Sequence, residues 1–150
     1  MKGKVVSVNV SEKKGMAKRP VNSLTLVPGL GVAGDAHAAP GDRQVSLLMN
    51  ESIERARSGA ECKINDGVEL IPGSYAENIT TAGIDLCELK LGDTLSIGAA
   101  RLRVTKIGKE CPRPCSIYYK LGSCIMPREG IFCEVLVGGE ARLGDEITID

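Results

Sequence analysis

Glycine and proline interrupt this chain so often that only short regular elements can form. The 150 residues include 18 glycines and seven prolines, which occur along most of the sequence. Between them lie short runs of Val, Ile, Leu and Thr in which apolar and polar residues alternate, as is typical of strands with one buried face. The sequence therefore predicts a fold made mainly of short strands.

The same patterns locate the expected elements. We expect strands at residues 4–10, 23–27, 43–49, 94–97, 101–104, 131–137 and 146–149. A short helix is expected over Glu51–Arg57, because Asn50 can cap its N-terminus and Gly59 can end it. Residues 12–20 are expected to form a polar hairpin tip or loop. Residues 29–42 are expected to form a long loop, of the kind that often carries function.

Many short strands, one or two short helices and no alternation of strands with helices favour one architecture. We expect a closed or partly closed barrel of short, mostly antiparallel strands, because closure hides the sheet edges. The length indicates a single domain spanning residues 1–150. Hydrophobic residues make up 43% of the chain but aromatic residues only 3%, so the core is expected to be aliphatic.

The charge balance excludes some function classes. The chain has 19 basic and 19 acidic side chains, so no field of one sign favours nucleic acid. It contains no run of about 18 apolar residues that could span a bilayer. The N-terminal segment lacks the apolar core of a secretory signal. We therefore expect a cytoplasmic protein that binds neither nucleic acid nor membrane.

Six cysteines, at positions 62, 87, 111, 115, 124 and 133, are expected to be thiols or ligands rather than disulfides. Cys115 follows Pro114 and precedes residues that can begin a helix. A helix N-terminus and the nearby Arg113 would stabilise its thiolate, so Cys115 is a candidate reactive cysteine. Cys111 is the second candidate. Cys87 and Cys133 lie among apolar residues and are expected to be small buried hydrophobes.

A zinc site is the alternative use of these thiols. Cys111, Cys115, Cys124 and Cys133 could supply four thiolates, although structural zinc sites usually have close ligand pairs at both ends and here only one pair is close. This alternative would make the chain a structural zinc-binding protein.

His37 is the only imidazole of the chain and follows Asp35 in the long loop. It could help to hold an anionic or polar ligand at the loop rim, or it could be a loop histidine bonded to a backbone carbonyl. Independently of His37, five basic residues could form a local cationic pocket, or could be ordinary solvated surface. These are Arg43, Lys109, Arg113, Lys120 and Arg128.

Several stretches, in order along nearly the whole chain, together resemble the MOSC domain, the family named after the C-terminal domain of molybdenum cofactor sulfurase. They are Gly34-Asp35-Ala36-His37-Ala38, Arg43–Leu48, Gly73–Leu86, Leu89–Asp93, Cys111–Cys115, Pro127–Phe132 and Gly138-Gly139 to Gly144-Asp145. The chain is similar to the compact stand-alone form of the family.

The resemblance implies a β-barrel associated with the molybdenum cofactor and with sulfur transfer. A cysteine of the family, matched best by Cys115 and next by Cys111, would carry sulfane sulfur as a persulfide or ligate molybdenum. The pterin phosphate or the oxo ligands of the metal would be held by His37, Arg43, Asn78, Arg113 and Arg128.

The implied role is a sulfur carrier that delivers sulfur to a metal–sulfur or molybdenum centre, as a sulfurtransferase or a molybdenum cofactor-dependent enzyme. Its partners would be a cysteine desulfurase or other sulfur donor, and a molybdenum enzyme or cofactor biosynthesis protein. Pyridoxal phosphate is expected only in a partner or in fused relatives. The alternative role is a molybdopterin-binding module without catalysis.

Overall fold

The computed structural model describes residues 2–14, 16–58, 71–108, 125 and 129–150. Nearly half of these residues lie in short strands, and the chain also forms one α-helix and one 3₁₀ helix in its described part. In chain order the elements are β1 (Lys2–Val10), β2 (Arg19–Val21), β3 (Ser23–Val27), β4 (Gly31–Val32), β5 (Val45–Met49), α1 (Asn50–Ser58), β6 (Ile79–Ala82), η1 (Leu86–Glu88), β7 (Thr94–Ile97), β8 (Ala100–Ile107), β9 (Ile131–Val137), β10 (Gly139–Arg142) and β11 (Glu146–Ile149).

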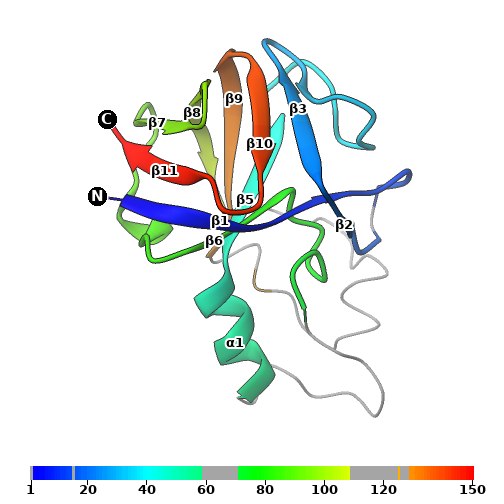
Figure 1. Cartoon of the computed structure of the whole chain (residues 1–150), viewed down its shortest axis with the longest axis vertical. Helices are drawn as coiled ribbons and strands as arrows, with labels where there is room; N and C mark the ends of the chain where they lie inside the picture. The colour runs from blue at the N-terminus through cyan, green and yellow to red at the C-terminus, as the bar shows by residue number, and fades with distance from the viewer. Residues whose placement is uncertain (1, 15, 59–70, 109–124, 126–128) are drawn as a thin grey trace.

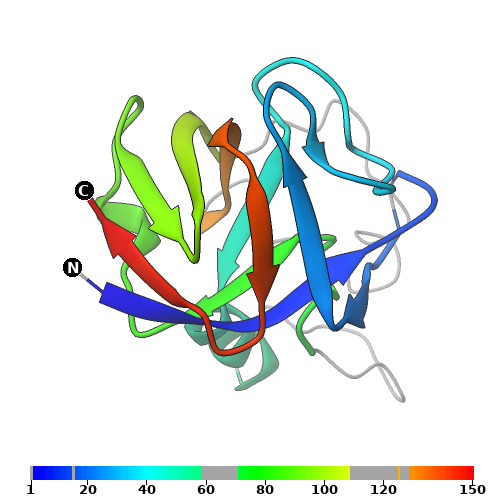
Figure 2. The same cartoon turned by 45° about the horizontal axis from the view of Figure 1, so that its top comes forward.

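Seven of the described strands close into a barrel (Figures 1 and 2). Around the ring, β1 is followed by β11, β7, β8, β9, β5 and β6, and β6 pairs with β1 again. β2 extends the sheet beyond β1. Closure pairs every strand of this ring on both sides, which removes the exposed edges that an open sheet would carry. The predicted barrel is confirmed.

One strand pair departs from the expected antiparallel pattern. β5 and β6 are parallel, with Leu47 opposite Ile79, and α1 lies in the connection between them. Parallel neighbours need a crossover of a dozen or more residues, usually with a helix. The segment β5–α1–β6 is therefore a strand–helix–strand unit, and the expectation that strands and helices do not alternate is wrong here. The helix α1 lies below the barrel in Figure 1.

All seven predicted strands are observed, and the structure adds further short ones. Residues 94–97, 131–137 and 146–149 form strands with the predicted bounds. The polar segment 12–20 contains the start of β2, and the loop 29–42 contains β4. The predicted helix is α1, and its expected stop, Gly59, lies outside the described residues. Within the described part of the chain there is no helix with the length and hydrophobicity of a membrane span.

Aliphatic side chains fill the barrel, as the composition predicts. Leu47, Ile79, Leu102 and Ile147 are fully buried in one cluster with Cys133. The expected burial of Cys133 is confirmed, and burial raises the pKa of its thiol. The corresponding prediction for Cys87 is wrong. In η1, Leu86 points inward, and Cys87 is exposed.

A second, three-stranded sheet lies beside the barrel. β10 pairs with β3, and β3 pairs with β4, both antiparallel. In Figure 2 the paired strands β10 and β3 stand next to one another, and the chain continues from β4 into the loop that precedes β5. This sheet therefore fixes the start of the loop that carries His37, and β5 fixes its end.

The loop that precedes β6 comes very close to the backbone of Lys18 at Gly73. Its carbonyl accepts a hydrogen bond of 2.8 Å from the backbone N–H of Lys18. A Cβ at position 73 would lie 2.2 Å from the Lys18 carbonyl oxygen, and the φ of Gly73 is +95°. Glycine is needed here for both reasons, because a side chain would clash and would strain the backbone.

We predict that Gly73→Ala destabilises the fold much more than Gly144→Ala. Gly144 has a similar φ of +91° but nothing within 4 Å of its added Cβ. The control substitution should cost about 1–2 kcal/mol for the backbone conformation alone. Gly73→Ala should add an overpacking cost of roughly 1–3 kcal/mol. Urea unfolding of both variants measures the difference, and equal losses would contradict the close approach.

Candidate functional site

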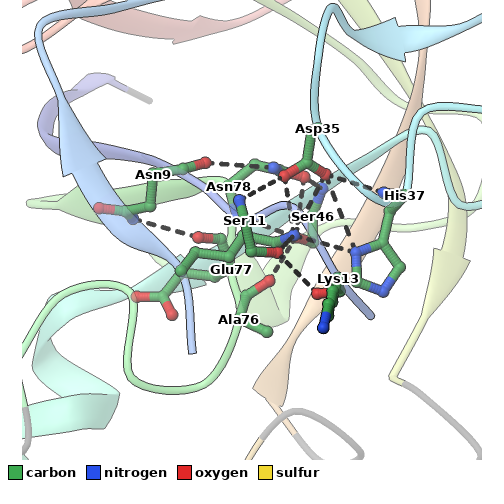
Figure 3. Close-up of polar contacts among 10 residues, drawn as sticks. Asn9, Ser11, Lys13, Asp35, His37, Ser46, Ala76, Glu77 and Asn78 are labelled. Atoms are coloured by element: carbon green, nitrogen blue, oxygen red, sulfur yellow. Dashed lines mark hydrogen bonds and ion pairs between the residues drawn. The ribbon is translucent and has the colours of Figure 1, made fainter. Parts of the chain in front are cut away.

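Polar side chains gather at the end of the barrel where β1 ends and β5 and β6 begin (Figure 3). They come from five segments that are far apart in the sequence: the end of β1, the segment before β2, the loop before β5, β5 itself and the loop before β6. Most of these polar side chains are buried. Buried polar groups are costly unless they are hydrogen-bonded, so their partners define the structure of the site.

The ammonium of Lys18 lies at the centre of this region. Its side chain is fully buried and forms an ion pair with the buried carboxylate of Asp35, with Nζ 2.9 Å from Oδ1 and 3.1 Å from Oδ2. It also donates to Ser11 Oγ at 2.9 Å and lies 2.9 Å from Nδ1 of His37. Lys18 thus joins the end of β1 to the loop that precedes β5.

Asp35 is held in its ionised form despite its burial. Burial by itself raises the pKa of a carboxyl group. Here the hydrogen bond from Lys18, the Ser11 N–H, the charge of Lys18 and the His37 N–H together outweigh that effect, so the pKa of Asp35 lies below its usual value. Figure 3 shows the carboxylate between Ser11 and His37.

An open pocket of about 410 Å³ lies against this network. Its described lining consists of Lys14, His37, Ala39, Pro40, Gly41, Asp42 and Arg43. The volume is in the range of small-molecule sites. The two cations, Lys14 and Arg43, outnumber the one carboxylate, which belongs to Asp42. The pocket therefore suits an anionic ligand, to which the ring of His37 offers a further polar group. Two of the predicted binding residues, His37 and Arg43, are brought together here.

Contacts from the barrel hold the Arg43 side of the pocket in place. The guanidinium of Arg43 lies over the ring of Phe132, 5.7 Å from its centroid, a cation–π arrangement. Thr105 Oγ1 donates to the Asp42 carbonyl at 2.6 Å. The buried amide of Gln44 donates to the Gly41 carbonyl and accepts from the Val135 N–H. The loop is therefore tied to β8 and β9.

Asn78, a third predicted binding residue, has a different position. Its side chain is buried, and its Oδ1 accepts from the N–H and the hydroxyl of Ser46, each at 3.1 Å. Its Nδ2 donates to the Asn9 carbonyl at 3.3 Å. It is not among the described residues that line the pocket. In this arrangement Asn78 joins β1 and β5 beneath the site.

Glu77 is a buried carboxylate that the sequence patterns did not single out. Its two oxygens accept from the N–H of Gly73 at 2.9 Å, the N–H of Tyr75 at 3.2 Å and the hydroxyl of Thr80 at 2.8 Å. Burial raises the pKa of Glu77, and these donors only partly oppose the effect. The carboxylate closes the turn in which Ala76 has a positive φ of 64° and in which Gly73 meets Lys18.

The remaining predicted site residues are Cys111, Arg113, Cys115 and Arg128, and all four lie outside the described residues. Lys109 and Lys120 of the expected cationic pocket lie outside them as well. Sequence reasoning missed Lys18, which stands in a charged stretch with no local sign of burial. It also missed the pocket role of Lys14. The sequence feature that did point to the pocket was the closeness of Asp35, His37 and Arg43 along the chain.

The described residues give no support to the zinc alternative. Of the four candidate ligands, Cys133 is fully buried among aliphatic side chains, and the other three lie outside the described residues. Among the residues that the structure describes, no group of three or more metal-ligating side chains is found.

Comparisons with known proteins agree with the observed fold. The family model of the MOSC domain matches residues 33–148. The solved structure of the YUAD protein from Bacillus subtilis is 24% identical with a TM-score of 0.76, over 98% of this chain and 94% of that one. YiiM from Geobacillus stearothermophilus and YiiM from Escherichia coli are each 20% identical with TM-scores of 0.71, over 99% and 100% of this chain and 75% and 70% of theirs. A comparison with curated proteins found no match.

We predict that Lys18→Met destabilises the fold by about 3–5 kcal/mol, because it leaves the Asp35 carboxylate buried without its cation. The double variant Lys18→Met/Asp35→Asn removes both charges and should regain a large part of that loss. Lys14→Met, the same substitution at an exposed position, should change stability by less than about 0.5 kcal/mol. Urea unfolding at neutral pH tests all three, and a double variant no more stable than Lys18→Met would contradict the ion pair.

Glu77 should make stability fall as pH rises. Its pKa is raised in the folded state, so between the ordinary value of 4.5 and the raised value the folded chain binds more protons than the unfolded chain. In that interval each step upward in pH lowers the free energy of unfolding. Glu77→Gln should remove this contribution to the dependence of stability on pH. The substitution should also lower the free energy of unfolding by about 1–3 kcal/mol, because the new amide N–H group faces donors that the carboxylate had accepted from. Urea unfolding across pH 4 to 8 measures the slope, with the exposed Glu12→Gln as control; an unchanged slope in Glu77→Gln would contradict the assignment.

Proposed function

Because this chain belongs to the MOSC domain family, which is associated with molybdenum cofactor sulfurase-like proteins, we propose that it is a sulfur carrier working with the molybdenum cofactor. It accepts sulfane sulfur on a reactive cysteine as a persulfide and delivers it to a metal–sulfur or molybdenum centre. The observation that carries the proposal is the pocket lined by the cations of Lys14 and Arg43 and by the polar ring of His37.

The donor groups of the pocket fit the cofactor. Molybdopterin presents a phosphate and the metal presents oxo ligands, all of which are hydrogen-bond acceptors. A guanidinium and an ammonium bind such groups through charge-assisted hydrogen bonds, so local affinity does not require a net positive chain. When bound, the cofactor supplies the metal centre that receives sulfur.

Each described residue has a distinct part in this proposal. Arg43, fixed by Phe132, and Lys14 hold the anionic groups. His37 contributes a ring nitrogen at the same rim. Asn78 keeps β1 and β5 in register below the pocket and acts through them. Arg113 and Arg128, outside the described residues, stay predicted ligands of the same groups.

The chain can bring its cysteines to this pocket. Thr105 of β8 bonds to the pocket loop at Asp42, and Arg43 contacts Phe132 of β9. Residues 109–128 connect these two strands, whose near ends are joined by a bond of 2.7 Å from the Gly108 N–H to the Gly130 carbonyl. Cys111 is six residues beyond Thr105, a separation that spans at most about 20 Å. Cys115 is four residues further.

The proposed transfer needs no external oxidant. The thiolate of Cys115 attacks the terminal sulfur of a donor persulfide, such as that of a cysteine desulfurase. A new sulfur–sulfur bond forms on Cys115, the donor's sulfur–sulfur bond breaks, and the donor cysteine leaves as its thiolate. For delivery, the thiolate of Cys111 attacks the inner sulfur of the persulfide, so that a Cys111–Cys115 disulfide forms and the outer sulfur leaves as sulfide for the acceptor centre. A dithiol reductant then restores the two thiols. Any pyridoxal phosphate belongs to the donor enzyme.

A cofactor-binding module without sulfur transfer is the second candidate. It is favoured by the described lining of the pocket, which supplies cationic and polar groups that suit binding alone. Purification without oxygen from a host that makes molybdopterin separates the two: a binding module should retain molybdenum and pterin at near stoichiometric amounts, whereas a carrier can be isolated with persulfide and without the cofactor.

We predict that sulfane sulfur from a cysteine desulfurase labels Cys115. Mass spectrometry of digested protein should find the persulfide on the peptide that contains Cys115, and Cys115→Ala should lose most of it. Cys87→Ala is the matched control. Cys87 is exposed, but partial burial and the neighbouring carboxylates of Asp85 and Glu129 raise the pKa of its thiol, so it should carry little of the label. Labelling that survives Cys115→Ala unchanged would reject the assignment.

A further inference from the structure

The contact between Lys18 and His37 determines which ring nitrogen carries the proton. Lys18 Nζ and His37 Nδ1 are 2.9 Å apart, the distance of a good hydrogen bond. A lysine ammonium has three N–H donors and no acceptor, while a neutral imidazole has one donor nitrogen and one acceptor nitrogen. At this distance one of the two nitrogens must therefore accept.

Lys18 is the donor, because its environment requires the charged form. Its side chain is fully buried, and both oxygens of the equally buried Asp35 lie within 3.1 Å of Nζ. A neutral amine would leave this carboxylate buried without a cation, which costs several kcal/mol. Ser11 Oγ, Asp35 and His37 Nδ1 then match the three N–H groups of the ammonium.

The carboxylate of Asp35 does not accept a hydrogen bond from Nδ1 of His37. The distance from Nδ1 to Asp35 Oδ2 is 3.8 Å, beyond hydrogen-bond range. Asp35 instead accepts from the backbone N–H of His37 at 3.1 Å, which fixes the ring relative to the carboxylate. A proton on Nδ1 would place two N–H donors against each other. Nδ1 is therefore unprotonated, and the proton of the neutral ring is on Nε2.

We propose that Lys18 is a positioning residue that holds His37 as the neutral Nε2–H tautomer, so that the imidazole serves the pocket's ligand as an N–H donor. Such a donor matches oxo, phosphate or carbonyl oxygens and cannot remove a proton from a ligand through Nε2. The Asp35 carboxylate keeps Lys18 charged and so determines the tautomer of His37 indirectly. The identity of the ligand rests on the proposed function, but the tautomer does not.

Nitrogen NMR of the full chain without cofactor tests the tautomer directly. Because His37 is the only histidine, tag-free ¹⁵N-labelled protein gives ring signals from this residue alone. A long-range ¹H–¹⁵N spectrum at neutral pH should show a pyridine-like Nδ1 and a pyrrole-like Nε2. A pyrrole-like Nδ1, two protonated nitrogens, or two averaged signals would each overturn the proposal.

Substitutions test whether Lys18 is the cause. Lys18→Met should bring the two nitrogen signals towards each other, because the ring is then free to exchange between tautomers. If that variant does not fold, Lys18→Met/Asp35→Asn removes the donor without leaving a buried charge and should give the same change. Lys14→Met, at the same pocket, is the matched control and should keep the wild-type signals. A wild-type spectrum in the folded Lys18 variant would refute the positioning role.

Amide replacements connect the tautomer to ligand binding. Glutamine can place an N–H group near the Nε2 position of histidine, whereas asparagine places its amide near Nδ1. After expression with molybdopterin, His37→Gln should retain several-fold more pterin per chain than His37→Asn, and the reverse order would count against the donor role. Wild-type protein that takes up neither molybdopterin nor persulfide sulfur but shows the predicted NMR signals would overturn the proposed function and leave the tautomer assignment standing.

Discussion

The site depends on one buried ammonium. Lys18 is removed from water at the end of the barrel, and its three N–H groups bond to Ser11, Asp35 and His37. Desolvating a charge is expensive, so the arrangement persists only where every one of those bonds is made. That requirement makes the ion pair a geometric constraint: the end of β1, the segment before β2 and the loop before β5 have to meet at this point for the chain to fold.

The barrel supplies the frame in which this meeting takes place. Because β5 and β6 are parallel, both begin at the end of the barrel where β1 finishes, and the loops that precede them lie side by side. One loop carries Asp35, His37 and Arg43. The other carries Glu77, whose carboxylate closes the turn that presents Gly73 to the backbone of Lys18. The parallel pairing of β5 with β6 thus brings the candidate binding residues and the residues that support them to one place.

The parts of this structure that sequence could predict are those set by local patterns. The strands at 94–97 and 131–137 show alternation or apolar runs, and His37 and Arg43 are close enough in sequence to suggest one pocket. β2 and β4 are too short to show a pattern, and β6 is buried along most of its length, so it does not alternate. Lys18 resembles its exposed neighbours Lys13 and Lys14 in sequence, because its burial is determined by Asp35, which lies three strands further along the chain. Asn78 was predicted from its motif, but its partners in β1 and β5 become visible only in three dimensions.

The pairing of β1 with β11 has a consequence for how such a barrel can be combined with other chains. Lys2 lies opposite Thr148, so the first and last strands run beside each other and the two termini lie close together (Figure 1). They lie at the start of β1, whereas the pocket lies near its other end. A tether or a fused module attached at either terminus would therefore leave from the face opposite the binding residues. The pocket would therefore stay accessible in such a fusion.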